Sequence, residues 1–60
     1  MEETIEVLIA DDNKEFCQLL AEFFEVSNDF KVVGMLYDGE QVLDYIKNNE
    51  NPDVLILDLI

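Results

Sequence analysis

The sequence predicts an α/β fold in which three short strands and two helices alternate as β-α-β-α-β. Two observations support this prediction. Apolar runs rich in β-branched residues occur three times, and each gap between them holds a segment whose apolar residues repeat with helical period. Because strands that alternate with helices form parallel sheets, the chain is expected to hold one small parallel sheet with helices packed against it.

The first strand is predicted at residues 5–10, where the run Ile-Glu-Val-Leu-Ile-Ala stops at the polar triplet 11–13. A helix is predicted at residues 14–25, because apolar residues recur there at helical spacing. This apolar stripe is formed by Phe16, Leu19, Leu20, Phe23 and Phe24. The stripe is expected to lie in the core or at an interface, and Cys17 is expected to be a small, partly buried helix residue.

The second strand is predicted at residues 30–36, where Gly34 would allow the close approach of a neighbouring backbone. Asp38 is expected to cap a second helix that runs to Lys47. The third strand is predicted at residues 53–60. This run is almost entirely apolar, which is typical of a strand that is covered on both faces.

Two strand orders are compatible with right-handed crossovers. If the third strand follows the second outward, both helices lie on one face of the sheet; if the chain passes back over the first strand, the helices cover opposite faces. We prefer the second arrangement, a parallel strand order 2-1-3, since the first strand is apolar on both faces. This order also creates a switch point, where ligands bind at the carboxyl ends of the strands.

Charge and composition argue against several function classes. Fifteen acidic residues face three lysines and no arginine, for a net charge of −12, so direct binding of nucleic acid or of an anionic membrane is not expected. One cysteine closes no internal disulfide, and without histidine a zinc site is not expected. Because the sequence shows neither a long apolar run nor the basic region of a signal peptide, a cytoplasmic location is expected.

Three acidic residues are expected to meet at one edge of the sheet. Asp11 and Asp12 follow the first strand, Asp58 lies near the end of the third, and parallel neighbours end at the same edge. Crowded carboxylates repel each other, and a hard cation such as Mg²⁺ would neutralise them. Asp58 is the candidate nucleophile for a phosphoryl group, because it interrupts an otherwise apolar strand. Two simpler interpretations stay open. Asp11, Asp12 and Asn13 could merely cap the first helix, with Glu15 completing a capping box to Asp12, or Asp58 could be an edge charge that discourages aggregation.

Three motifs in this order make the chain resemble the receiver domains of bacterial two-component response regulators. They are the acidic pair within residues 7–13, the Asp-Gly within 37–43, and the Pro-Asp-Val-Leu-Ile-Leu-Asp that opens 52–60. The resemblance covers the whole chain and implies a truncated flavodoxin-like (receiver) fold. Residues 1–60 would be the N-terminal part of a receiver domain, without strands four and five and their helices. Within the family, the Ala-Asp-Asp-Asn segment and the Asp-Leu-Ile ending are most similar to regulators of sporulation initiation.

The resemblance implies a role for each acidic residue. Asp58 matches the phosphoacceptor, Asp12 a direct ligand of Mg²⁺, and Asp11 an acidic partner that acts through a metal-bound water. The backbone carbonyl of Ile60 matches a further protein ligand, which with these aspartates completes the implied metal site. A histidine kinase or histidine phosphotransfer protein is the implied partner, and control of transcription is the implied output. Intact receivers also use a hydroxyl residue and a lysine from strands four and five, so without them phosphoryl transfer is expected to be weakened.

Two function classes stay open. The chain is either a phosphoacceptor segment or a non-phosphorylated fragment that self-associates and acts only as an interaction module. A chain of sixty residues gains about as much from burial as it loses in conformational entropy. A homodimer or higher oligomer is therefore expected, through the exposed edge of the third strand or exposed helix faces. An enzyme is not expected, because an aspartate-nucleophile phosphatase usually has a carboxylate two residues after the nucleophile, where this sequence has Ile60.

Overall fold

The computed structural model describes residues 3–49 and 51–59 and contains five elements in the predicted alternation. The three strands form one sheet of order β2-β1-β3, and both neighbours of β1 run parallel to it. The predicted fold class and strand order are confirmed, and the alternative order, with the third strand outside the second, is wrong. The elements are β1 (Ile5–Asp11), α1 (Lys14–Glu25), β2 (Phe30–Leu36), α2 (Gly39–Asn48) and β3 (Val54–Asp58).

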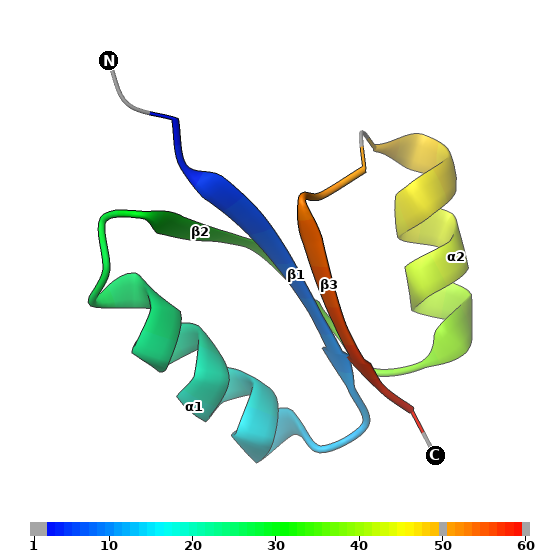
Figure 1. Ribbon diagram of the computed structural model, residues 1–60. Coiled ribbons are helices and arrows are strands. Elements are labelled where there is room, and N and C mark those ends of the chain that lie inside the picture. The colour runs from blue at the N-terminus through cyan, green and yellow to red at the C-terminus, as the bar shows by residue number, and fades with distance from the viewer. Residues whose placement is uncertain (1–2, 50, 60) are drawn as a thin grey trace.

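The two helices cover opposite faces of the sheet. In Figure 1, β2 lies behind β1 and β3 lies towards the viewer, with α1 on one side of the strands and α2 on the other. Right-handed crossovers on either side of β1 produce this arrangement. The carboxyl ends of β1 and β3 and the start of α1 therefore meet at one end of the molecule, the lower end in Figure 1. Neither helix of the described chain has the length and hydrophobicity needed to span a bilayer.

Side chains cap the start of each helix. The N-cap of α1 is Asn13, whose side-chain oxygen accepts a hydrogen bond from the backbone N–H of Phe16 at 3.0 Å. Of the three candidate caps, Asn13 is therefore the one that caps the helix, and the capping box between Asp12 and Glu15 is wrong. Asp38 caps α2 as predicted, since its carboxylate accepts a hydrogen bond from the backbone N–H of Gln41 at 2.9 Å. Each cap satisfies a backbone donor that has no partner within its own helix.

The core centres on β1, which has a strand on each side and a helix over each face. On the face covered by α1, the side chains of Cys17 and Ala21 are buried in the same cluster as those of Val7 and Ile9. Cys17 is fully buried, which is deeper than predicted. The least exposed part of β1 comprises Val7, Leu8, Ile9 and Ala10, each at most 1% exposed.

The predicted apolar stripe of α1 lies only partly in the core. Leu20 and Phe24 pack against the buried cluster, and the ring centroid of Phe24 lies 5.1 Å from that of Phe30. Phe16 and Phe23, by contrast, are 45% and 68% exposed. The reason is that α1 contacts the sheet along the line of its small residues, so the aromatic stripe lies to one side of that contact.

Gly34 allows a close approach, as predicted, but its close neighbour is a side chain. It is the partner of Leu8 in the pairing of β1 with β2, directly after a shift in register. A Cβ atom at this position would lie 3.0 Å from Cδ1 of Leu8 and 3.6 Å from Cε2 of Tyr45. The glycine therefore leaves room for Leu8 to be fully buried beneath α2.

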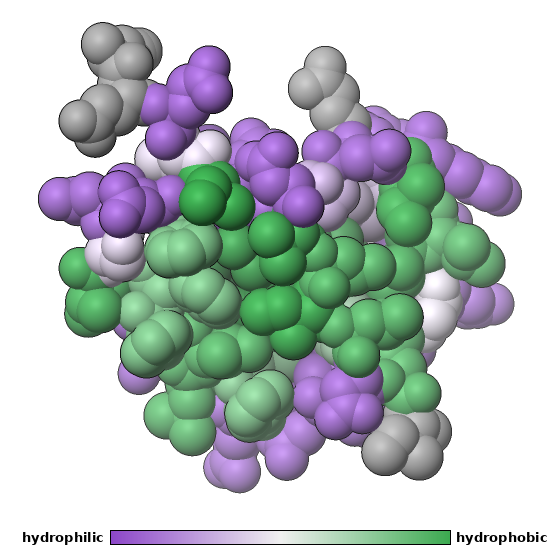
Figure 2. All heavy atoms as spheres, viewed as in Figure 1, coloured by the Kyte–Doolittle hydropathy of each residue, from purple (hydrophilic) through white to green (hydrophobic). Residues whose placement is uncertain are grey.

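β3 is the least covered strand. It is shorter than the predicted 53–60, and among the described residues no strand pairs with its outer edge. Val54, Leu55 and Leu57 are 41%, 39% and 57% exposed, so β3 lacks, among the described residues, the cover on both faces that is typical of so apolar a run. Figure 2 shows apolar atoms spread over β3 and the near sides of both helices.

Candidate functional site

The acidic residues at the carboxyl end of the sheet are positioned by strand pairing. Asp11 is the last residue of β1, Asp58 is the last residue of β3, and the two are direct partners in the parallel register. Because side chains alternate along a strand, Asp11 shares a face with Val7 and Ile9, which pack against α1. Both carboxylates are therefore on the α1 face of the sheet, where the chain enters that helix.

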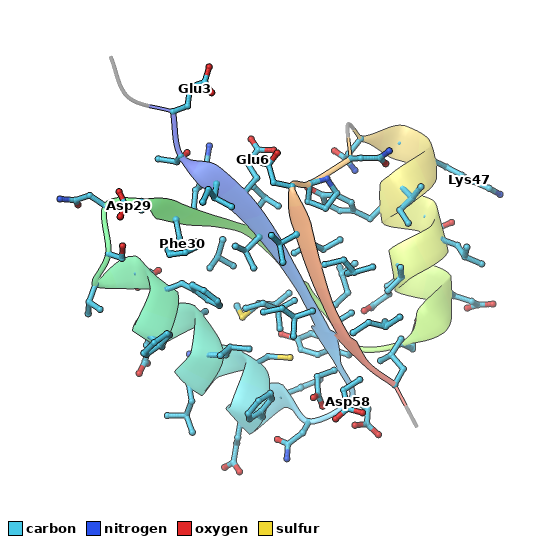
Figure 3. The ribbon with its side chains drawn as sticks, viewed as in Figure 1. Glu3, Glu6, Asp29, Phe30, Lys47 and Asp58 are labelled. Atoms are coloured by element: carbon cyan, nitrogen blue, oxygen red, sulfur yellow. The ribbon has the colours of Figure 1, made fainter. Side chains whose placement is uncertain are left out.

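A hollow of about 290 Å³ opens at this end of the molecule. Figure 3 shows Asp58 at the end of β3 near the start of α1, at the opposite end of the molecule from Asp29 and Glu6. The structure thus brings together the three acidic residues that were predicted to meet, while their chemical roles stay predictions. The lining residues are Asp11, Asp12, Asn13, Phe16 and Asp58.

Asp11 differs from the other two carboxylates in its burial. It is 6% exposed, whereas Asp12 and Asp58 are open to solvent. Its carboxylate accepts a hydrogen bond from the backbone N–H of Asn13 at 2.8 Å, and its carbonyl oxygen accepts one from the thiol of Cys17 at 3.4 Å. These contacts hold the turn between β1 and α1. Asp11 therefore fixes one wall of the hollow, whereas the carboxylates of Asp12 and Asp58 are accessible from solvent.

The donor atoms of the hollow suit a hard divalent cation, since they are carboxylate and amide oxygens. Within residues 3–49 and 51–59, however, no three acidic or other ligand-type side chains lie close enough together to hold a metal ion. The carboxylates surround the hollow without forming a complete ligand shell. An ion that keeps several of its own waters, as Mg²⁺ does, fits such an open arrangement. The predicted carbonyl ligand of Ile60 lies outside the described residues.

Two lining residues were not predicted as part of the site. Asn13 was considered only as a candidate helix cap and as part of the family motif, and Phe16 was assigned to a core or interface stripe. Both line the hollow because they occupy the N-cap and first turn of α1, directly after the acidic pair. Their position directly after the first strand could have indicated that they belong to the site, since loops at the carboxyl end of a parallel sheet surround its binding sites.

Cys17 lies next to the site, and its thiol is expected to be unreactive. Burial raises the pKa of the Cys17 thiol above its ordinary value, and the negative charge of Asp11 raises it further. Because the thiolate is the reactive form, alkylation by iodoacetamide at about pH 8 should be at least tenfold slower in the folded protein than in concentrated urea. Mass spectrometry of timed samples measures both rates. Equal rates in the two states would contradict this account of Cys17.

Comparison with known proteins agrees with this geometry. The family described as response regulator receiver domain matches residues 7–60, which is all of the chain but its first six residues. No solved structure matches the chain. Receiver domains generally bind Mg²⁺ for phosphorylation and exchange phosphoryl groups with histidine kinases or phosphotransfer proteins. The match extends over both strands that carry the acidic hollow, and the chain belongs to the response regulator receiver domain family.

Proposed function

We propose that the chain is a phosphoacceptor segment of a two-component response regulator, and not an enzyme, with Asp58 as the residue that accepts the phosphoryl group. One observation carries this proposal: Asp58 ends β3 directly beside Asp11 and shares a solvent-open hollow with Asp12. A carboxylate nucleophile next to two further carboxylates needs a cation to offset their repulsion when a phosphate approaches. The oxygen donors of the hollow are suited to hold that cation.

In the proposed step, a carboxylate oxygen of Asp58 attacks the phosphorus of a phosphohistidine or of a small acyl phosphate. The new P–O bond forms as the P–N bond of phosphohistidine, or the P–O bond of the small donor, breaks, and the leaving group keeps the electron pair. Asp11 and Asp12 would hold Mg²⁺, which supplies charge neutralisation at the transferring oxygens when bound. The hydrogen bond from the Asn13 N–H orients the Asp11 carboxylate for that role.

Phosphorylation of this segment is expected to be slow. Among the described residues no lysine lines the hollow, and the ammonium of Lys14 instead lies 5.1 Å from the ring centroid of Tyr37. The protein therefore supplies no cationic side chain to the phosphoryl oxygens in this part of the chain. Stabilisation of the developing charge would depend on the divalent cation, which makes the reaction strictly dependent on Mg²⁺.

Incubation with acetyl phosphate and Mg²⁺ is expected to add the mass of one phosphoryl group, and Asp58→Asn should abolish this addition. The amide is isosteric with the carboxylate but is not nucleophilic. Intact mass spectrometry measures the yield, and chelation of Mg²⁺ should also abolish it. Asp29→Asn removes an equal charge at the opposite end of the sheet and should leave the yield unchanged (Figure 3). An equal yield in the Asp58→Asn protein would contradict the assignment.

We further propose that the regulator controls transcription at the start of sporulation. The support is the similarity of residues 10–13 and of the Asp-Leu-Ile ending to the receiver of stage zero sporulation protein A. The phosphoryl donor would then be a cytoplasmic histidine kinase or phosphotransfer protein. The DNA-binding output would lie outside residues 1–60, because a net charge of −12 disfavours direct contact with phosphates. Absence of transfer to Asp58 from a phosphotransfer protein of a sporulation phosphorelay would count against this proposal.

A second candidate function is a self-associating interaction module that is not phosphorylated. The observation in its favour is the exposed apolar edge of β3, which no strand covers among the described residues. The acetyl phosphate experiment separates the two candidates, because the interaction module gains no mass that depends on Asp58.

A further inference from the structure

We propose that the ring of Tyr37 holds the ammonium of Lys14 outside the acidic hollow and so keeps the hollow open to a divalent cation. Lys14 is then an internal competitor of Mg²⁺, and Tyr37 is a positioning residue that sets how strongly Lys14 competes. The inference rests on the proposed function of the hollow as a Mg²⁺ site, and it adds a means of regulation that lies outside the hollow itself.

The first support is the contact between the two side chains. The ammonium of Lys14 lies over the ring of Tyr37, 5.1 Å from the ring centroid. This distance is within the roughly 6 Å at which the negative face of an aromatic ring attracts a cation. The chain has fifteen acidic residues and only three lysines, yet this lysine is directed to a neutral ring. The contact therefore selects one direction for the Lys14 side chain.

The second support is the fixed position of the ring. Tyr37 directly follows β2, and in the sheet order β2-β1-β3 the end of β2 and Asp58 lie on opposite sides of β1. The backbone N–H of Tyr37 donates a hydrogen bond to the side-chain oxygen of Gln41 at 2.6 Å. The half-buried ring packs against the buried cluster between β1 and α1. Tyr37 is thus a rigid platform that draws the exposed Lys14 side chain away from Asp58.

The third support is the distance along the chain between Lys14 and the hollow. Lys14 is the first residue of α1, directly after Asn13 and two residues from both Asp12 and Phe16, and all three of these residues line the hollow. Its four-carbon stem is flexible. Carboxylates attract an ammonium for the same reason that they attract Mg²⁺. Without the ring, Lys14 would therefore enter the hollow and would have to leave before Mg²⁺ binds.

The two positions of Lys14 are close in free energy. A cation–π contact and an ion pair at an exposed site each shift an equilibrium by up to about fivefold. Neither contact dominates, so the ring decides how often the hollow is free of the ammonium. Apparent affinity falls in proportion to the fraction of the protein that is competent to bind. Removal of the ring should therefore weaken Mg²⁺ binding by about two- to threefold.

Tyr37→Leu is expected to raise the dissociation constant for Mg²⁺ by about two- to threefold. Isothermal titration at an ionic strength of about 0.02 M measures this change, because charges are weakly screened there, and circular dichroism verifies the fold. Tyr37→Phe keeps the ring and should bind Mg²⁺ like the unchanged protein. An unchanged dissociation constant in the Tyr37→Leu protein would overturn the proposal.

A second substitution separates this role from a merely structural role of Tyr37. In a protein that already carries Lys14→Gln, adding Tyr37→Leu should leave the affinity for Mg²⁺ unchanged, because no ammonium remains to compete. If Tyr37→Leu weakened binding equally with and without Lys14, the ring would act only through the fold, and the proposal would be overturned.

Lys47→Gln is the matched control for charge. It removes the same charge in the last turn of α2, and Figure 3 shows Lys47 directed outward from that helix, away from Asp58. In the Tyr37→Leu protein, Lys14→Gln should restore the affinity for Mg²⁺ and Lys47→Gln should not. Equal recovery with the two substitutions would show that only net charge matters, which would contradict a specific role of Lys14.

Nuclear magnetic resonance tests the position of Lys14 without a metal. Protons above the face of an aromatic ring are shielded, so the ε-methylene signals of Lys14 should lie upfield of those of Lys47. The difference should persist in Tyr37→Phe and disappear in Tyr37→Leu. Its absence from the unchanged protein would overturn the proposal even if the hollow binds Mg²⁺. An upfield shift in a protein that binds no Mg²⁺ would instead reject the metal site of the proposed function, and the competition with it.

Discussion

Replacement of Ile9 by alanine is expected to unfold much of the protein. Ile9 is fully buried at the centre of β1, opposite Ile56 on one side and Met35 on the other. Substitutions of buried isoleucine by alanine lower the free energy of unfolding by about 2–5 kcal/mol, through lost burial and the cavity left behind. A domain of sixty residues has a total stability of only about 3–9 kcal/mol. The substitution therefore removes a large share of that stability.

Urea unfolding followed by circular dichroism, at equal protein concentrations, measures this effect. Ile5→Ala is the matched control, since it makes the same chemical change at the start of the same strand, where the side chain is 40% exposed. This control should lower the free energy of unfolding by less than about 1.5 kcal/mol, because a side chain that is already partly exposed loses less buried apolar surface. Equal losses of stability at the two positions would show that β1 is not the centre of the core.

The double substitution Asp11→Asn with Asp12→Asn is expected to lower the affinity for Mg²⁺ by at least roughly 100-fold, because it removes two of the three charges around the hollow. Asparagine can still accept the hydrogen bond from the Asn13 N–H, so the turn before α1 should keep its shape. Isothermal titration with Mg²⁺ measures the affinity, and circular dichroism verifies the fold.

Asp29→Asn is again the control, because Figure 3 places Asp29 at the far end of the sheet. Its affinity for Mg²⁺ should equal that of the unchanged protein. If the double variant bound Mg²⁺ as tightly as the Asp29→Asn protein, the acidic hollow would not be the metal site. The result is independent of Asp58, which keeps its carboxylate in both variants.

The convergence of the acidic residues could be predicted because it depends on topology alone. Once the first and third strands are parallel neighbours, residues at their carboxyl ends must meet, whatever the details of packing. This is why Asp11 and Asp58, far apart in the chain, were expected beside each other and are direct partners in the sheet. The different burial of Asp11 and Asp12 was not predictable, since it depends on where β1 gives way to the turn.

Which residue caps α1 could also not be predicted from the sequence. Asp12 and Asn13 are both good N-cap residues, and the sequence offers a capping box only for Asp12. In the structure, Asn13 has the extended backbone of an N-cap, with φ −92° and ψ 105°. The direction of the backbone as it leaves β1 decides which of the two residues becomes the N-cap of α1. That direction is set by the packing of the helix on the sheet.

The sequence by itself determined the alternation of strands and helices, the cap at Asp38 and the end of the sheet where carboxylates gather. These features follow from the period of apolar residues, from local hydrogen bonding and from the handedness of crossovers. Only the tertiary structure decided which apolar residues are buried: Cys17 is in the core, while Phe23 and Leu57 are exposed. Burial depends on which element lies across from a side chain, and a pattern within one segment does not contain that information.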